Sequence, residues 1–281
     1  TEGNESDVES AVADTIYQLI LYPEIRAIFI DKSYISQIPF DLRSIRDDLF
    51  NILYVLALWN PEVFNEDIVK EFQILIKKNP SKSLRIISVI AQHYPIAYTS
   101  YTMLDQLIAG KLIFSREETA VQYAATIGYL CGISKTFTDA RKKYLHPILM
   151  SLLSSEDKKI VNAALSALTE IANRDPSLGV PFDFVVDNIS DVDLHLSLVN
   201  LMMVSDIGDA AHQMDEQCVQ LFLEAAASTP GVLYILVKLS ENSSVAYWMM
   251  NDLNWLNDSS MPIDCRLRLL EAIFAHSRVR H

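Results

Sequence analysis

The chain contains 281 residues, half of which are apolar, and it carries a formal net charge of −13. Only 7 glycines and 10 prolines occur, too few for a sheet protein with many tight turns, and the apolar content is too high for a disordered chain. The negative charge disfavours binding to nucleic acid or to anionic membranes, and no apolar run is long enough to span a bilayer.

The three cysteines, Cys131, Cys218 and Cys265, are widely spaced. Their odd number and their spacing argue against a disulfide framework and favour a reducing compartment. We therefore expect a cytoplasmic or nuclear protein. Because the sequence begins without Met, we also expect it to be a fragment of a longer chain.

Residues 1–9 are polar and acidic, and we expect them to form a flexible N-terminal tail. From residue 10 to residue 281, apolar periodicity alternates with short breaks, and each of the prolines, including Pro147, is predicted to mark a break. Helices interrupted this often favour a repeat protein over a bundle or a globin-like fold. The strongest helical segments are residues 43–60, 82–95, 117–134, 157–176, 193–206, 231–242 and 264–277.

Two of these segments align with each other at an offset of about forty residues. Val121 aligns with Val161, and Ala124 aligns with Ala164, which places small residues where a neighbouring helix must approach closely. Extending this register gives about seven units of roughly 35 to 40 residues each. One such unit cannot bury its apolar face alone, so stacking is required. The pattern predicts an all-α solenoid over residues 10–281.

The segment DKKIVNAALSALTEIANRDP, residues 157–176, resembles the armadillo/HEAT pattern. It contains a polar turn, a β-branched residue, a pair of alanines, a Leu-x-x-Leu spacing and a terminal Ala-Asn, and residues 117–134 share part of this pattern. The resemblance implies a right-handed α-solenoid and a eukaryotic, intracellular scaffold or adaptor. The Trp-x-x-x-Asn motif of the nuclear-import members is missing, because Trp59, Trp248 and Trp255 are not followed by Asn at that spacing.

Polar side chains recur at helical spacing on the predicted helices, and such stripes are able to bond the backbone of an extended peptide. The same stripes would also arise from amphipathicity alone, and both readings remain open. Arg85 with Gln92, and Ser197 with Asn200, fit the pattern in two weaker units. The clearest candidate partner-binding residues are Asp47, Asn51 and Tyr54, then Gln122, Thr126 and Tyr129, and then Asn162, Ser166, Thr169 and Asn173.

The C-terminal part of the chain is strongly acidic, with no Lys or Arg between Arg174 and Lys238. A solvated acidic surface is one interpretation, and a docking face for a basic partner is the other. For the docking interpretation, the candidate residues are Asp187, Asp191 and Asp193.

No motif in the sequence predicts catalysis, a metal site or a cofactor. There is no His-Glu-x-x-His, Cys-x-x-Cys, Gly-x-Ser-x-Gly or phosphate-binding glycine loop. We therefore expect a non-catalytic scaffold or adaptor, which binds a peptide, a helix or a basic domain of another protein on its groove or on its acidic C-terminal part. Two alternatives remain open, namely a transport or chaperone factor with many clients and a domain that regulates a catalytic domain in cis.

Overall fold

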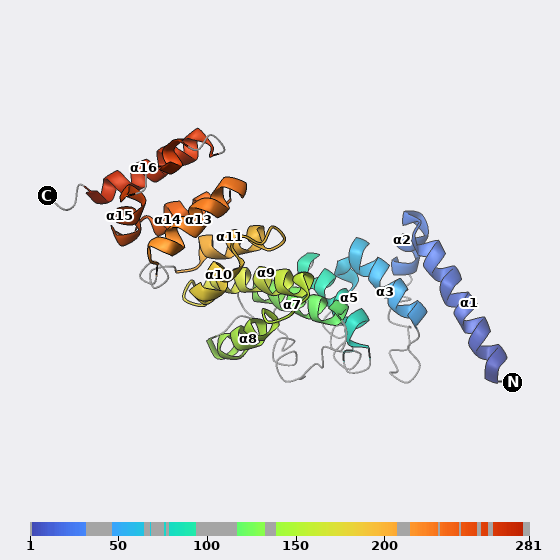
Figure 1. Cartoon of the computed structure of the whole chain (residues 1–281). Helices are drawn as coiled ribbons and strands as arrows, with labels where there is room; N and C mark the ends of the chain where they lie inside the picture. The colour runs from blue at the N-terminus through green and yellow to red at the C-terminus, as the bar shows by residue number, and fades with distance from the viewer. Residues whose placement is uncertain are drawn as a thin grey trace. The chain divides into compact units, whose positions relative to one another are not determined.

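The computed structural model describes residues 2–31, 47–64, 68, 76, 79–93, 117–132, 139–206, 214–229, 231–241, 243–251, 254–257 and 261–277. All regular secondary structure within these ranges is helical (Figure 1). The expected all-α fold is therefore confirmed. The chain forms two compact units, Thr1–Leu145 and His146–His281.

The helices of the first unit pack in chain order. They are α1 (Glu2–Ile20), α2 (Pro23–Asp31), α3 (Asp47–Trp59), the short η2 (Pro61–Val63), α5 (Pro80–His93) and α7 (Glu117–Gly132). Helix α1 packs on α3, α3 on α5 and α5 on α7, which makes one row (Figure 1). The facing side chains are apolar and fully buried, as Leu53, Leu84 and Ile127 show. Helix α8 (Asp139–Leu152) crosses the boundary between the units.

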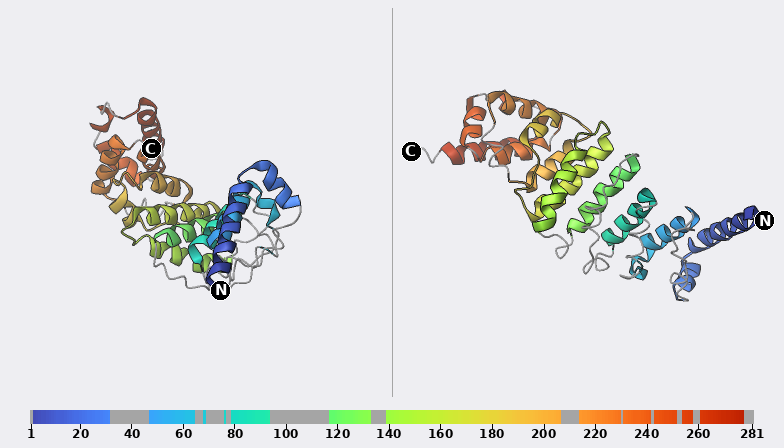
Figure 2. Two further views of the ribbon diagram at one scale, coloured as in Figure 1. Left: turned by 90° about the vertical axis from the view of Figure 1, so that its right-hand side faces the viewer. Right: turned by 90° about the horizontal axis from the view of Figure 1, so that it is seen from below.

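The second unit has two rows of helices. Its helices are α9 (Lys158–Arg174), α10 (Phe182–Asn188), α11 (His195–Val204), α13 (Glu216–Ser228), α14 (Val232–Leu239), α15 (Ser243–Asn251), the short η4 (Asn254–Asn257) and α16 (Ile263–Ser277). Helices α9, α11, α14 and α16 pack one after another in the first row, and α10, α13 and α15 do so in the second (Figure 2). The contacts of α13 with α14 and of α15 with α16 join the two rows.

Each of the seven segments with strong periodicity overlaps a helix of the structure, namely α3, α5, α7, α9, α11, α14 and α16. The aligned alanines Ala124 and Ala164 are both fully buried, as close helix approach requires. Prolines stand at several of the predicted helix starts, for example Pro23 and Pro80 at the first positions of α2 and α5. A proline fits there because the first N–H groups of a helix have no intrahelical acceptor.

Two details differ from the sequence-based expectation. Helix α1 begins at Glu2, so residues expected to form a flexible tail have helical backbone. Acidic residues near a helix N-terminus interact favourably with the helix dipole, which accounts for the extension. Pro147 lies inside α8 and does not break it. A proline removes one intrahelical hydrogen bond but does not always end a helix, and α8 continues through it here.

Candidate functional site

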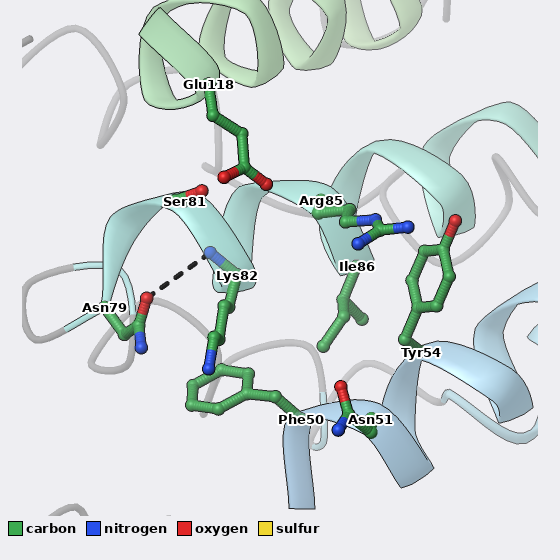
Figure 3. A pocket seen from close by; sticks show the side chains of 9 residues that line it. All are labelled: Phe50, Asn51, Tyr54, Asn79, Ser81, Lys82, Arg85, Ile86 and Glu118. Atoms are coloured by element: carbon green, nitrogen blue, oxygen red, sulfur yellow. Dashed lines mark hydrogen bonds between the residues drawn. The ribbon is translucent and has the colours of Figure 1, made fainter. Parts of the chain in front are cut away.

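A polar pocket of about 230 Å³ opens between α3 and α5 in the first unit (Figure 3). It brings together Asn51 and Tyr54, two of the predicted binding residues, with Arg85 from the next unit of the predicted repeat. Helix α7 contributes one residue from its first turn, and the start of α5 closes one side. The lining residues are Phe50, Asn51, Tyr54, Asn79, Ser81, Lys82, Arg85, Ile86 and Glu118.

Aromatic rings position both cations of this pocket. The guanidinium carbon of Arg85 lies 4.0 Å from the ring centroid of Tyr54, and the ammonium of Lys82 lies 5.9 Å from that of Phe50. Cation–π contacts of this kind restrict the conformations of a long side chain. The Asn79 side-chain oxygen accepts the backbone N–H of Lys82 at 3.4 Å, which caps the start of α5.

The predicted stripe on α7 does not form a binding surface as a whole. Thr126 is fully buried, and its hydroxyl lies 2.7 Å from the carbonyl oxygen of Gln122 and 3.3 Å from that of Leu84 on α5. The prediction that Thr126 faces a groove is therefore wrong. Its side chain is buried where α7 packs on α5, and a threonine can be buried there because its hydroxyl bonds backbone carbonyls. Gln122 is half-buried, and Tyr129 is exposed. Asp47 is the first residue of α3, and its side chain lies outside the described part of the structure.

The stripe on α9 divides into two kinds of residue. Asn162 donates to the carbonyl oxygen of Asp193 at 2.9 Å and accepts from the Ser197 hydroxyl at 2.7 Å, so it joins α9 to the start of α11. Thr169 is half-buried and donates to the carbonyl of Leu165. Ser166 and Asn173 are exposed. The predicted stripe is therefore partly a helix-to-helix connection and only partly an open surface.

The acidic candidates also differ in role. Asp191 forms an ion pair with Lys158 and accepts the backbone N–H of Asp193 at 2.9 Å. The hydrogen bond from Lys158 holds the pKa of Asp191 below its ordinary value. Asp187 and Asp193 are exposed carboxylates. Asp191 therefore shapes the turn before α11, whereas the other two carboxylates face solvent.

Three exposed apolar side chains of the second unit lie on one face of α11 and its preceding turn. Val192, Leu196 and Met203 are 73%, 65% and 45% exposed, and the predicted residue Asn200 lies between them. Their spacing places these four residues on one side of the helix, and we call them the α11 stripe. Sequence reasoning missed it because α11 is apolar all round, a pattern that reads as a fully buried helix.

Lys238 fixes α14 against this surface. Its ammonium donates to the carbonyl oxygens of Met202, Met203 and Ser205, at 2.9, 2.9 and 2.7 Å. These carbonyls end α11, where a cation interacts favourably with the helix dipole. Burial lowers the pKa of Lys238. Tyr234, which is 45% exposed, lies one helical turn before Lys238 on α14, the helix that packs on α11.

Few other groups in the described residues have the features of a reactive site. No cluster of three His, Cys, Asp or Glu side chains there could hold a metal ion. None of the three cysteines forms a disulfide, and burial raises the pKa of the Cys218 and Cys265 thiols, so both stay protonated at neutral pH. Among the described helices, none combines the length and the apolar character that a membrane span needs.

No protein-family model matches this sequence, and no curated protein shows significant similarity to it.

Proposed function

We propose that this protein is a non-catalytic scaffold that binds a basic amphipathic helix of a partner protein on the α11 stripe. The proposal includes the finer architecture suggested by the sequence, a right-handed armadillo/HEAT-like solenoid of about seven repeats. It also places the protein in a reducing compartment, the cytoplasm or the nucleus, because the cysteines form no disulfide.

The exposure of the α11 stripe is the observation that carries the proposal. Leu198 and Leu201 on the opposite side of α11 are fully buried, so α11 already has a complete core-facing side. Val192, Leu196 and Met203 are not needed for that core and remain in contact with water. Covering an apolar side chain contributes about 1.5 to 3 kcal/mol at full burial, so clustered exposed apolar residues favour a binding surface.

The charge around the stripe selects the partner. Asp193 at the start of α11, Asp206 at its end and Glu241 after α14 are exposed acidic residues. Lys238 donates to the α11 carbonyls and also interacts with Asp206 and Glu241, so it offsets only part of the negative charge of these three residues. Complementary charge speeds association and rejects acidic partners. A helix with an apolar face and flanking Lys or Arg residues therefore fits best.

A partner helix would pack its apolar face on this surface. Apolar residues of the partner, spaced three or four apart, would pack on Leu196, Met203 and Tyr234. The Asn200 amide, which is exposed between them, would supply a hydrogen bond that fixes the register. The flanking cations would contact the acidic residues at the rim of the surface.

The test is fluorescence anisotropy with labelled helical peptides and the whole chain. One peptide is apolar on one face and basic on the other, a second replaces Lys and Arg by Glu, and a third scrambles the first. We expect saturable binding of the basic amphipathic peptide alone. Leu196→Asp should weaken this binding by about tenfold or more, because a charge would be buried under the peptide.

A matched control carries the same chemical change in the other unit. Ile28 on α2 is 55% exposed, so Ile28→Asp adds the same charge to an exposed apolar position. This variant should bind like the wild type. Equal binding of the basic and scrambled peptides, or unchanged binding by Leu196→Asp, would refute the proposed surface.

A further inference from the structure

We infer that a pocket between α13 and α15 is a separate binding site, which receives the guanidinium group of an arginine side chain in a partner peptide. The pocket has a volume of about 250 Å³, and its two helices pack on each other in the second unit. None of its residues belongs to the α11 stripe, so the inference does not rest on the proposed function. The lining residues are Glu216, Gln217, Val219, Gln220, Leu223 and Trp248.

The helices around this pocket carry only negative charge. Helices α10, α13 and α15 form the second row and contain no Lys or Arg, and their charged residues are Asp183, Asp187, Glu216 and Glu224. Burial raises the pKa of the Cys218 thiol in the first turn of α13, and the charges of Asp215 and Asp183 raise it further, so both carboxylates act on this turn. A cation that enters the pocket would therefore meet a negative potential.

Glu216 is the group that pairs with the cation. It is exposed in the first turn of α13, and it forms no ion pair within the described residues. The positive end of the helix dipole would by itself disfavour a cation there. Asp215 offsets that effect, because its carboxylate caps α13 by accepting the Cys218 backbone N–H at 2.8 Å. The Glu216 carboxylate is therefore available to accept two N–H groups of a guanidinium.

The apolar part of the lining favours arginine over lysine. Trp248 on α15 is half-buried, and the Tyr247 ring packs edge-on against it with the ring centroids 5.6 Å apart. A planar, weakly hydrated guanidinium stacks on an indole ring, whereas an ammonium group is compact and strongly hydrated. The methylene groups of the arginine would lie against Val219 and Leu223.

The two glutamines supply further acceptors for the guanidinium. The Gln220 amide nitrogen donates to Glu224 at 3.4 Å, so the carbonyl oxygen of this side chain is the atom left for a ligand donor. Gln217 is exposed beside it. Because arginine carries five N–H groups, it can bond Glu216 and an amide oxygen at the same time.

The experiment is an NMR titration of the isotope-labelled whole chain with three blocked peptides of the form Ala-Ala-X-Ala-Ala, in which X is Arg, Lys or citrulline. The Arg peptide should saturably shift the Trp248 indole N–H and the backbone amides of residues 216–223. The citrulline peptide keeps the shape of arginine without its charge and should bind about tenfold more weakly. The Lys peptide should also bind more weakly than the Arg peptide. No saturable shift with the Arg peptide would overturn the inference, as would equal or tighter binding of either comparison peptide.

Four variants make the test specific. Glu216→Gln should weaken Arg-peptide binding about tenfold, because the ion pair is lost, whereas Glu271→Gln removes the same charge from an exposed position on α16 and should have no effect. Trp248→Leu should also weaken binding, and if circular dichroism shows that it does not fold, Glu216→Gln decides the matter alone. Leu196→Asp on the α11 stripe should bind the Arg peptide like the wild type. Unchanged binding by Glu216→Gln, or lost binding by Leu196→Asp, would contradict the proposed site.

Discussion

At the scale of single residues, hydrogen bonds separate structural from available polar groups. Asn162 and Thr126 were both predicted to face a groove, yet each bonds a neighbouring helix or its own backbone. Asn51 and Asn200 are exposed instead. The distinction matters because a polar group with satisfied hydrogen bonds in the folded chain gains little from a ligand. Asn51 and Asn200 are thus the better candidates for binding.

Asp191 gives a prediction at this scale. Asp191→Asn should lower the free energy of unfolding at neutral pH by about 1 kcal/mol, because the ion pair with Lys158 is lost and the bond to the Asp193 N–H is weakened. The folded pKa of Asp191 is depressed, so its stabilisation is present above the unfolded pKa of about 3.9 and is lost as the pH falls through the lower folded value. Urea denaturation at neutral and acidic pH measures both effects.

Asp193→Asn is the matched control for this prediction. Asp193 is exposed, and its side chain takes part in no ion pair among the described residues, so the variant should stay within about 0.5 kcal/mol of the wild type at neutral pH. The gap between wild type and Asp191→Asn should narrow in acid. A gap that widens as the pH falls would show that Asp191 is not stabilised as a carboxylate.

At the scale of elements, Lys238 links two helices through one side chain. Lys238→Met keeps most of the apolar stem but removes three hydrogen bonds to the end of α11. We expect a loss of about 1 to 3 kcal/mol in the free energy of unfolding, together with faster amide exchange in the last turn of α11. Lys143→Met, at an exposed position on α8, is the control. Equal stability of the two variants would argue against the cap.

The helices were predictable from the sequence, but the side-chain contacts between them were not. Apolar periodicity located α3, α5, α7, α9, α11, α14 and α16, because each of these helices must bury one face. The contacts that decide the role of Asn162 and Lys238 join residues that are 31 to 36 positions apart in sequence. No local pattern encodes such a contact. The pocket at Arg85 was half predicted, since its stripe residues were named but Lys82 and Glu118 were not placed with them.

At the scale of the whole molecule, stability should follow the order of the packed helices. In each unit, the helices pack on neighbours in the row, so the free energy of a core contact is shared mainly with adjacent helices. Leu198 on α11 and Leu53 on α3 are both fully buried, and each lies in a different unit. Truncating either leucine to alanine should cost about 2 to 5 kcal/mol.

Amide hydrogen exchange would show which helices lose stability in each variant. Leu198→Ala should increase amide exchange in α9, α11 and α14, which pack on one another, and leave α1, α3 and α5 near their wild-type protection. Leu53→Ala should give the reverse pattern, so each variant serves as the control for the other. If either substitution raised exchange equally in all of these helices, the chain would unfold as one cooperative body. A local response would instead mean that a ligand on one surface stabilises mainly the helices of its own unit.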